Sequence, residues 1–421
     1  MMRNLLIVSM ILACVAACGS NPRQQEPVVV KVPVVLNETL TNSDSQIERL
    51  DSLDLEIRKY MASSGFIGAS LSIMKNDSLV YAKGYGLADT DTPMEAFNSF
   101  RLASVSKLVT AAGIMKLTEQ GRLTLDDKVF GPYGILGDED FNSVIKDPNY
   151  FKITVEHLLR HQGGFNSYAG DPMFSTRTLI IQNHLDTVPD FNALSRIYLK
   201  RRIAVPGTEH IYSNYGYLVL SKVIEKITGE DYENWTQENI LRPAGCYDFH
   251  IARNYYEERH PRETRYFSHD DSPVQEYNNS GREVQRAYGG SDITGLSGGG
   301  AWVASTPELM RFVASIDGRE GVPDILSSGS INEMTRYLGH EYYGLGWSDI
   351  AEDGTWTRTG TLAETTAIIK YYSDGECWIF VSNTGTFRGA RQANITAGVL
   401  ARLRNRFSAS LPERDLFTSH P

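Results

Sequence analysis

Cysteine is scarce in this sequence, with 4 residues among 421. Cys14 and Cys18 lie close to the N-terminus, and Cys246 and Cys377 lie far apart in the rest of the chain. Two distant cysteines cannot form the framework of a disulfide-stabilised fold, so stability has to come from a packed core. We expect both of these thiols to be buried.

An excess of basic residues is also missing. The chain holds 41 Lys and Arg against 51 Asp and Glu, which gives a formal net charge of −10. This balance argues against a nucleic-acid partner and against a basic face that binds anionic membranes. No internal repeat is evident, and the length permits one large domain or several smaller ones.

The apolar run near the N-terminus is too short to remain in a membrane as a helix. It extends over 5–15, follows Arg3 and leads into small residues, so 1–17 is predicted to be a signal peptide. Residues 15–18 resemble a bacterial lipobox, in which Cys18 is lipidated after cleavage; a plain signal peptide is the alternative. We therefore expect a lipid-anchored protein of the bacterial cell envelope, facing the periplasm or the exterior, with a flexible tether over 18–44.

Strand patterns occur near both ends of the remaining chain, and helical patterns lie between them. One domain is predicted over 45–405, followed by a C-terminal tail over 406–421. Strands are expected at 66–74, 78–85, 344–348, 355–359, 365–372 and 378–383, and helices at 45–61, 104–120, 153–160, 215–227 and 388–404. A further helix is expected to start at Pro307, with Thr306 as its cap. This order predicts an α/β (α+β) fold with a central antiparallel sheet formed by both chain ends, flanked by helices, and a mainly helical inserted subdomain. Residues 248–289 show no clear period and indicate a long surface excursion.

Ser104 and Lys107 stand three residues apart at the start of an apolar helical run. Because positions i and i+3 share one face of a helix, the hydroxyl and the ammonium are expected side by side. A lysine made less basic by burial or by nearby cations can take a proton from a serine, which makes Ser104 a candidate nucleophile. Read alone, the pair also fits the polar face of an ordinary helix.

Two further segments carry groups suited to acyl transfer. Tyr212 and Asn214 lie two residues apart just before a predicted helix, where a phenol can pass a proton and an amide can bind a lysine or a substrate. Residues 356–361 form a predicted strand with a cation, hydroxyls and a glycine that permits close backbone approach. Each segment alone fits an ordinary turn or edge strand.

Together, the three segments resemble the S-x-x-K, tyrosine-bearing and K-T-G motifs of the serine β-lactamase and penicillin-binding protein superfamily, in the same order. The resemblance is closest to the class C branch, which includes β-lactamases, D,D-peptidases, D-amino-acid peptidases and esterases. It covers about 45–405, and residues 153–164, 206–248, 299–312 and 343–347 are also similar to that branch.

The resemblance implies a role for each matching residue. Ser104 would be the acylated nucleophile, Lys107 its proton partner, and Tyr212 the general base that later protonates the leaving group. Asn214 would position Lys107 and the substrate, and the backbone N–H groups of Ser104 and Thr361 would form the oxyanion hole. Thr359 and Gly360 would line the substrate site.

Two departures from the family pattern lie beside this site. Arg358 stands where the family usually has Lys or His, and Ala363 with Glu364 replaces a common Pro-Gly pair. Because arginine stays protonated and grips carboxylates with a planar fork, we expect Arg358 to hold a substrate carboxylate and to lower the pKa of Tyr212. Alternatively, Arg358 turns away and pairs with Glu364.

We therefore predict a serine hydrolase that acts through an acyl-enzyme on an amide or ester bond, as an esterase, a D-amino-acid peptidase, a D,D-carboxypeptidase or a β-lactamase-like enzyme. The alternative is a non-catalytic lipoprotein that binds cell-wall peptide on the same fold. No cofactor or metal is expected: His157 and His161 are four apart, but Glu156 precedes the first histidine instead of following it, and no third ligand is evident. The expected partners are a small-molecule or peptide substrate and, through the lipid anchor only, a membrane; a monomer is expected.

Overall fold

The computed structural model describes residues 36–418, apart from 166–169, 271, 340–342 and 363. The predicted signal peptide, Cys18 and most of the predicted tether therefore lie outside the described residues. None of the described helices is long and apolar enough to cross a membrane.

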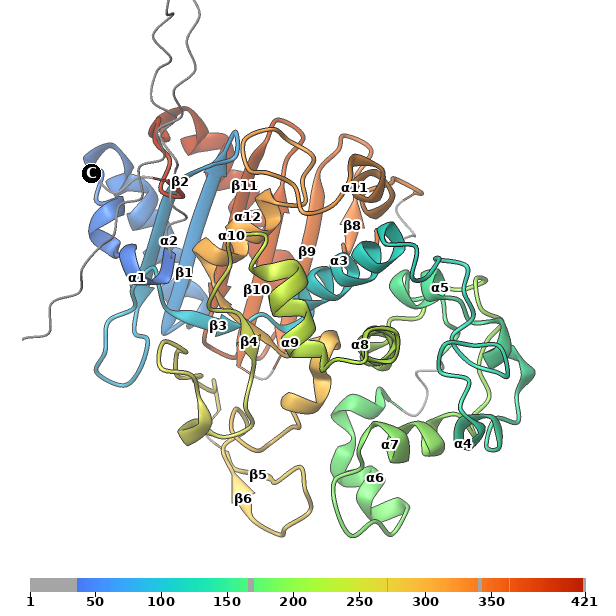
Figure 1. The fold of residues 1–421 in the computed structure, drawn as a ribbon. Coiled ribbons are helices and arrows are strands. Elements are labelled where there is room, and N and C mark those ends of the chain that lie inside the picture. Colours follow the sequence, from blue (N-terminus) through green and yellow to red (C-terminus); the bar gives the residue numbers. More distant parts are fainter. Residues whose placement is uncertain (1–35, 166–169, 271, 340–342, 363, 419–421) are drawn as a thin grey trace, which may run out of the picture. The chain divides into compact units, whose positions relative to one another are not determined.

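A six-stranded antiparallel sheet joins segments from both ends of the chain (Figure 1). Its order is β2-β1-β11-β10-β9-β8, with β1 Gly68–Lys75, β2 Ser78–Gly86, β8 Asp349–Ile350, β9 Trp356–Leu362, β10 Thr365–Tyr371 and β11 Glu376–Ser382. The N-terminal strand β1 pairs antiparallel with the C-terminal strand β11, which confirms the predicted sheet.

Twelve helices lie around and beyond this sheet within the described part of the chain. They are α1 Leu36–Thr39, α2 Asp51–Ser64, α3 Ser106–Glu119, α4 Glu139–Asn142, α5 Val155–Leu159, α6 Thr176–Gln182, α7 Phe191–Tyr198, α8 Asn214–Thr228, α9 Tyr232–Thr236, α10 Thr306–Ala314, α11 Ser328–Met334 and α12 Arg391–Phe407. Helices α4 to α7 lie on the far side of α8 from the sheet, as the predicted helical insertion requires (Figure 1). Small sheets are formed by β3 Ser99–Arg101, β7 Trp302–Ser305 and β4 His250–Ile251, and by β5 Val274–Gln275 with β6 Glu283–Val284.

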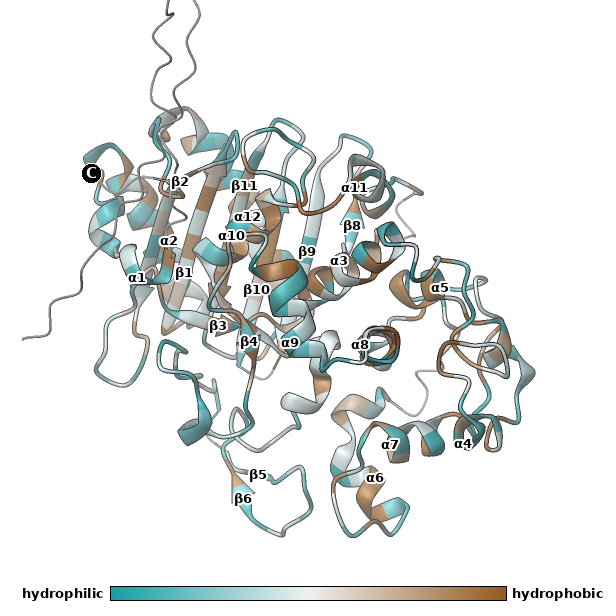
Figure 2. Ribbon diagram, in the orientation of Figure 1, coloured by the Kyte–Doolittle hydropathy of each residue, from teal (hydrophilic) through white to brown (hydrophobic). Residues whose placement is uncertain are grey.

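The two faces of the main sheet are covered by different helices. On one face, Leu71 and Ile73 of β1 share an apolar core with residues of α2 and α12. On the other face, Ser70 and Ser72 lie against α10, where both hydroxyls form hydrogen bonds with the Thr306 hydroxyl, at 2.7 and 2.8 Å. This alternation follows from the two-residue period of a strand. Figure 2 shows hydrophobic residues along the strands and along α3, which is buried over most of its length.

Local sequence signals placed several elements correctly. The hairpin between β1 and β2 turns at Asn76 and Asp77, whose φ angles of 50° and 58° suit these two residue types. Helix α8 ends at Gly229, which adopts a left-handed conformation with φ of 77°. Cys246 and Cys377 are both free and buried, as expected.

The strand predicted over 344–348 is wrong, because pairing begins only at β8. Gly346 has φ of 84° and passes close to α3: a Cβ atom at this position would lie 2.9 Å from the Cβ atom of Ala111. Close packing against a buried helix, rather than strand pairing, determines the conformation of this segment.

The predicted domain boundaries are too narrow at both ends. Leu36 and Leu40, placed in the tether, are buried, and the side chain of Asn37 binds Asp248 at 2.8 Å and Ser305 at 2.6 Å. At the other end, α12 continues to Phe407, and Leu411, Leu416 and Phe417 of the predicted tail are buried. Both margins therefore belong to the packed structure.

Candidate active site

Ser104 lies in a tight turn that precedes α3. Residues Ala103–Val105 form a 3₁₀ turn, and Ala103 has φ of 49°, an uncommon conformation for this residue type. Gly360 of β9 packs directly against this turn, because a Cβ atom there would lie 3.1 Å from the Ser104 nitrogen and 2.6 Å from the Leu102 oxygen. The glycine therefore allows β9 to approach the backbone of Ser104.

The structure brings the hydroxyl of Ser104 together with Tyr212 and Lys107. Tyr212 Oη lies 2.5 Å from Ser104 Oγ, and Lys107 Nζ lies 3.2 Å from the same oxygen. Lys107 is fully buried and also donates hydrogen bonds to Asn214 Oδ1, at 2.7 Å, and to the carbonyl oxygen of Gly299. Two segments more than a hundred residues apart in sequence thus meet at one hydroxyl.

Asp171 holds Asn214 in place, a role that the sequence analysis missed. Its Oδ2 atom accepts hydrogen bonds from the backbone nitrogen of Asn214, at 2.8 Å, and from Nδ2, at 2.9 Å. The Asn214 amide therefore directs its oxygen toward Lys107. Asp171 lies 43 residues before Asn214 in an irregular segment, so no local pattern indicated this contact.

Burial and neighbouring charge lower the pKa of Lys107 well below its usual value. Desolvation is the main cause, the positive charge of Arg358 adds to it, and the negative charge of Asp171 opposes it. A neutral amine has two N–H groups, which suit Asn214 Oδ1 and the Gly299 carbonyl, and one lone pair, which suits the hydroxyl of Ser104. The environment of Lys107 is therefore that of a base.

Tyr212 keeps 38% of its surface exposed, yet packing around its hydroxyl raises its pKa. The charge of Arg358 and the hydrogen bond with Ser104 act in the opposite direction and lower it. The resting phenol is therefore neutral and holds a proton that it can donate.

Arg358 is buried beneath the site, with only 1% of its surface exposed. Its Nε donates a hydrogen bond to the carbonyl oxygen of Ser104 at 2.8 Å, and its buried Nη2 donates to no acceptor among the described residues. Glu364 instead binds the Ser268 hydroxyl, at 2.9 Å, and lies 4.0 Å from Arg286. Both expectations for its contacts are therefore wrong: Arg358 neither pairs with Glu364 nor presents a fork to the cleft. The positive charge of Arg358 lowers the pKa of Tyr212, as predicted, but burial outweighs it and the pKa is raised overall.

Thr359 and Thr361, two of the three other predicted site residues of β9, face the opposite way from Arg358. Thr359 and Thr361 are partly exposed, whereas Arg358 and Gly360 are buried against the Ser104 turn. This pattern follows from strand alternation. The oxyanion hole at the backbone nitrogens of Ser104 and Thr361 remains a prediction.

The two histidines that could suggest a metal are occupied in other contacts. His157 Nδ1 accepts a hydrogen bond from the Thr154 nitrogen, and His161 Nδ1 accepts one from the Ser213 nitrogen, both at 3.2 Å. The ring of His161 lies 4.3 Å from that of Tyr212, and burial lowers the pKa of His161 well below its usual value. Among the residues that the structure describes, no three His, Cys, Asp or Glu side chains are grouped to hold a metal ion.

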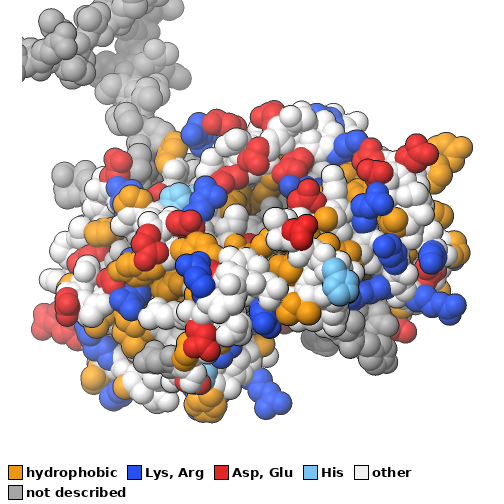
Figure 3. Space-filling view, turned by 90° about the horizontal axis from the view of Figure 1, so that it is seen from below, with side chains coloured by type: hydrophobic (Ala, Val, Ile, Leu, Met, Phe, Trp, Pro, Cys, Tyr) orange, Lys and Arg blue, Asp and Glu red, His pale blue; other side chains and the backbone are white. Residues whose placement is uncertain are grey.

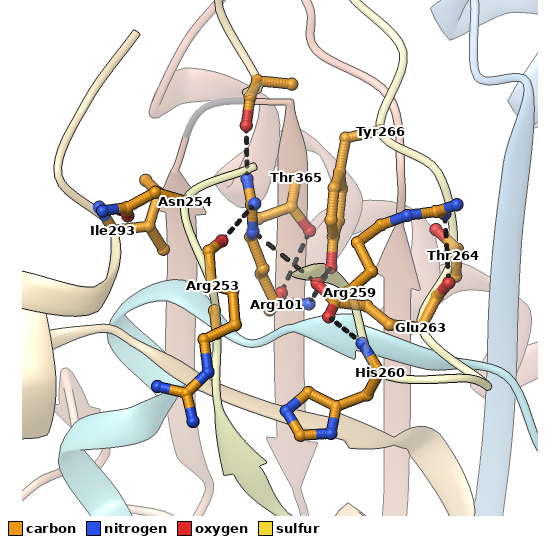
Figure 4. Close-up of polar contacts among 12 residues, drawn as sticks. Arg101, Arg253, Asn254, Arg259, His260, Glu263, Thr264, Tyr266, Ile293 and Thr365 are labelled. Atoms are coloured by element: carbon orange, nitrogen blue, oxygen red, sulfur yellow. Dashed lines mark hydrogen bonds and ion pairs between the residues drawn. The ribbon is translucent and has the colours of Figure 1, made fainter. Parts of the chain in front are cut away.

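Arg101 lies three residues before Ser104 and contacts the segment 248–289, the surface excursion in which the sequence predicted no helix or strand (Figure 4). Its guanidinium donates to the carbonyl oxygens of Ala287, at 2.8 Å, and Arg253, at 3.0 Å, and lies 3.7 Å from the Glu263 carboxylate. The ring of Tyr266 lies 4.4 Å from this cation. A buried arginine paired in this way fixes the excursion next to the turn that carries Ser104.

Comparison with known proteins agrees with this geometry. Residues 53–402 match the family described as Beta-lactamase. The chain belongs to the β-lactamase family. The proteins of this family to which it is similar include penicillin-binding proteins and carboxypeptidases, so the broad class is serine hydrolase.

Two curated relatives are bacterial. A protein of Escherichia coli (strain K12) named "Putative D-alanyl-D-alanine carboxypeptidase" is 28% identical over 225 residues, which cover 51% of this chain and 50% of that protein. A protein of Bacillus subtilis (strain 168) named "Putative penicillin-binding protein PbpX" is 26% identical over 318 residues, which cover 74% and 69%. The match thus spans about half the length of the E. coli relative.

Solved structures show the same fold. The octameric penicillin-binding protein homologue from Pyrococcus abyssi has a TM-score of 0.61 and 25% identity, with 84% of this chain and 77% of that chain covered. The D-amino acid amidase from Ochrobactrum anthropi, solved with L-phenylalanine amide, has a TM-score of 0.66 and 20% identity, with 86% and 99% covered.

Proposed function

We propose that Ser104 forms an acyl-enzyme with an amide or ester substrate and that water then hydrolyses it. The observation that carries this proposal is the contact of one hydroxyl with two proton-handling groups, Tyr212 at 2.5 Å and Lys107 at 3.2 Å. Such a hydroxyl can lose its proton as it attacks, because the base already lies within hydrogen-bond reach.

The pKa directions favour Lys107, not Tyr212, as the base that takes the Ser104 proton, which differs from the roles implied by the resemblance. Lys107, with its lowered pKa, takes the Ser104 proton as Oγ bonds to the substrate carbonyl carbon. The tetrahedral oxyanion is stabilised by the backbone N–H groups of Ser104 and Thr361. Tyr212, with its raised pKa, then donates its proton to the leaving group as the bond to that group breaks.

Hydrolysis of the acyl-enzyme restores the starting protonation of Tyr212, Ser104 and Lys107. The Tyr212 oxygen, negatively charged after acylation and next to the charges of Lys107 and Arg358, takes a proton from the attacking water. The new tetrahedral intermediate expels Ser104 Oγ, which recovers its proton from Lys107. Both residues are then ready for another turnover, and no metal or cofactor takes part in this scheme.

For the substrate class, we propose a broad esterase or a peptidase and amidase for D-amino-acid compounds in preference to a dedicated β-lactamase. The names of the relatives support this choice, as does the unusual Arg358. The direct test compares hydrolysis of p-nitrophenyl esters, D-alanyl amides and nitrocefin by the same preparation. Faster turnover of an ester or amide supports the proposal, whereas turnover of nitrocefin alone contradicts it.

For localisation, we propose a lipid anchor at Cys18 in the bacterial cell envelope. The bacterial relatives named for cell-wall enzymes support the compartment. Cys18→Ala should release the protein from the membrane fraction, whereas continued membrane association of this variant through its N-terminus would contradict the anchor.

A further inference from the structure

Tyr212, the candidate proton donor, lies in a segment that has no regular secondary structure. Residues 206–213 form neither helix nor strand, and α8 begins only at Asn214. Tyr212 is also 38% exposed, so packing encloses only part of it. Contacts from another part of the chain therefore have to hold its hydroxyl at 2.5 Å from Ser104 Oγ.

His161, in the turn after α5, binds the backbone on both sides of Tyr212. Its carbonyl oxygen accepts a hydrogen bond from the Ile211 nitrogen at 2.8 Å, and its Nδ1 accepts one from the Ser213 nitrogen at 3.2 Å. His161 has φ of 58°, a conformation that is uncommon outside glycine, although histidine and asparagine adopt it more often than most residues. One residue thus holds both neighbours of Tyr212.

The ring of His161 also packs on the ring of Tyr212. The two ring centroids lie 4.3 Å apart, and the ring planes are inclined by 31°. The ring of Tyr217, on α8, lies 5.1 Å from that of His161, and the Tyr217 hydroxyl donates to the Leu159 carbonyl oxygen at 2.8 Å. The imidazole therefore contacts Tyr212 from a turn that is itself bound to α8.

The hydrogen bond from Ser213 requires a neutral imidazole, because Nδ1 can accept only while it carries no proton. Histidines in contact with water, such as those visible on the face in Figure 3, titrate near neutral pH, whereas His161 is only 2% exposed. Burial lowers the pKa of His161 well below its usual value, and the neighbouring Lys107 and Arg358 act in the same direction. The acceptor at Nδ1 is therefore available at neutral pH.

We propose that His161 is a positioning residue, which holds the Tyr212 hydroxyl where it can protonate the leaving group. The bonds to Ile211 and Ser213 fix the backbone of Tyr212, and the imidazole supports the phenol ring. Proton transfer needs hydrogen-bond reach, so a displacement of about 1 Å is enough to slow it strongly. His161 itself exchanges no proton. This inference rests on the proposed function, because His161 acts through Tyr212.

The test compares two substrates with the same acyl group, a D-alanyl p-nitroanilide and the matching p-nitrophenyl ester. The aniline nitrogen has to receive a proton as the C–N bond breaks, whereas p-nitrophenolate can leave as an anion. In single-turnover acylation, His161→Gly should lose about tenfold or more with the anilide and less than about threefold with the ester. A general loosening of the fold would slow both reactions alike.

His161→Asn is the rescue variant. Asparagine and glycine both suit a φ of 58°, but only asparagine offers an oxygen that can accept from the Ser213 nitrogen in place of Nδ1. His161→Asn should therefore react with the anilide at least about fivefold faster than His161→Gly. In a Tyr212→Phe background, His161→Gly should cause no further loss with the anilide, because both changes act through one hydroxyl.

His157→Gln is the matched control, because it removes a partly buried histidine of α5 that lies four residues before His161. His157 Nδ1 accepts from the Thr154 nitrogen at 3.2 Å in a capping box, and glutamine can keep this arrangement. The control should react with both substrates at the wild-type rates.

Equal losses with both substrates, no loss in His161→Gly, no recovery in His161→Asn, or a further loss in the Tyr212→Phe background would each overturn the inference. If melting curves show that His161→Gly does not fold, His161→Phe takes its place, since it fills the space without an acceptor; if neither folds, the inference is also rejected. The proposed function fails separately: the wild type would then show no acylation by either substrate and no fluorophosphonate adduct on Ser104.

Discussion

The Nε atom of Arg358 donates a hydrogen bond to the backbone carbonyl of Ser104 at 2.8 Å. The cation is therefore fixed directly beneath the turn that carries the candidate nucleophile, and it lowers the pKa of both Lys107 and Tyr212. A buried charge in this place acts on the proton-handling groups rather than on a substrate carboxylate.

Arg358→Gln should raise the pKa of Lys107, because a neighbouring positive charge is lost. The acid limb of the kcat/KM profile should then move to higher pH by about one unit, since Lys107 has to be neutral to act as the base. Losses should be equal for a carboxylate-bearing ester and its neutral analogue. Arg358→Lys is the control that keeps a cation; an unmoved acid limb in Arg358→Gln would contradict this role.

Asp171→Asn should move the acid limb of the kcat/KM profile to lower pH, opposite to the effect of Arg358→Gln. The Asp171 carboxylate raises the pKa of Lys107, so its removal should lower that pKa and shift the acid limb to lower pH. The rate at the optimum should fall by about tenfold, because Asn214 loses a charged partner for its two N–H groups. A shift to higher pH would show that Asp171 does not act through its charge.

Tyr212→Phe and Lys107→Ala should each lower the rate of acylation by about a hundredfold or more. Phenylalanine keeps the ring that packs on His161 and removes only the hydroxyl, so the melting temperature should change little. Pre-steady-state measurement with a D-alanyl p-nitroanilide, whose amine leaving group has to receive a proton as the C–N bond breaks, separates acylation from hydrolysis of the acyl-enzyme. Near-normal acylation in Tyr212→Phe would reject its role as proton donor.

The buried carboxyl group of Asp317, away from the site, should make stability depend on pH. Burial and the nearby Asp77 raise the pKa of Asp317, whose Oδ2 accepts from the Tyr371 hydroxyl at 2.9 Å. The folded state thus binds a proton more tightly than the unfolded chain, so the free energy of unfolding should fall as the pH rises from about 4 to 7, by at most about 1.4 kcal/mol per pH unit.

Asp317→Asn should remove this decline and increase stability at pH 8. Urea unfolding between pH 4 and 8 measures the effect, and Asp186→Asn, at an exposed position, is the control. If wild type and Asp317→Asn show the same pH dependence, Asp317 does not titrate in this range.

The sequence was informative where a signal is local. The turn at Asn76 and Asp77, the end of α8 at Gly229 and the one-face spacing of Ser104 and Lys107 all depend on neighbours within a few residues. Such features are set by backbone preference and by the period of a helix or strand.

Contacts between distant segments could not be predicted in this way. Asp171 reaches Asn214 across 43 residues, and Arg101 reaches Glu263 across a still longer separation. The orientation of Arg358 was also predicted wrongly. Whether a side chain of a strand faces the cleft or the turn that carries Ser104 depends on which segment packs against that face of the strand. Only the folded chain determines that neighbour.

The central claim is that Ser104 forms a covalent acyl-enzyme. Intact-mass measurement after incubation with a fluorophosphonate and with a fluorescent penicillin tests it directly, with peptide mapping to locate the adduct. We expect one adduct on Ser104 with at least one reagent and none in Ser104→Ala. No adduct on Ser104 with either reagent would contradict the enzyme and would support a non-catalytic binding protein on this fold.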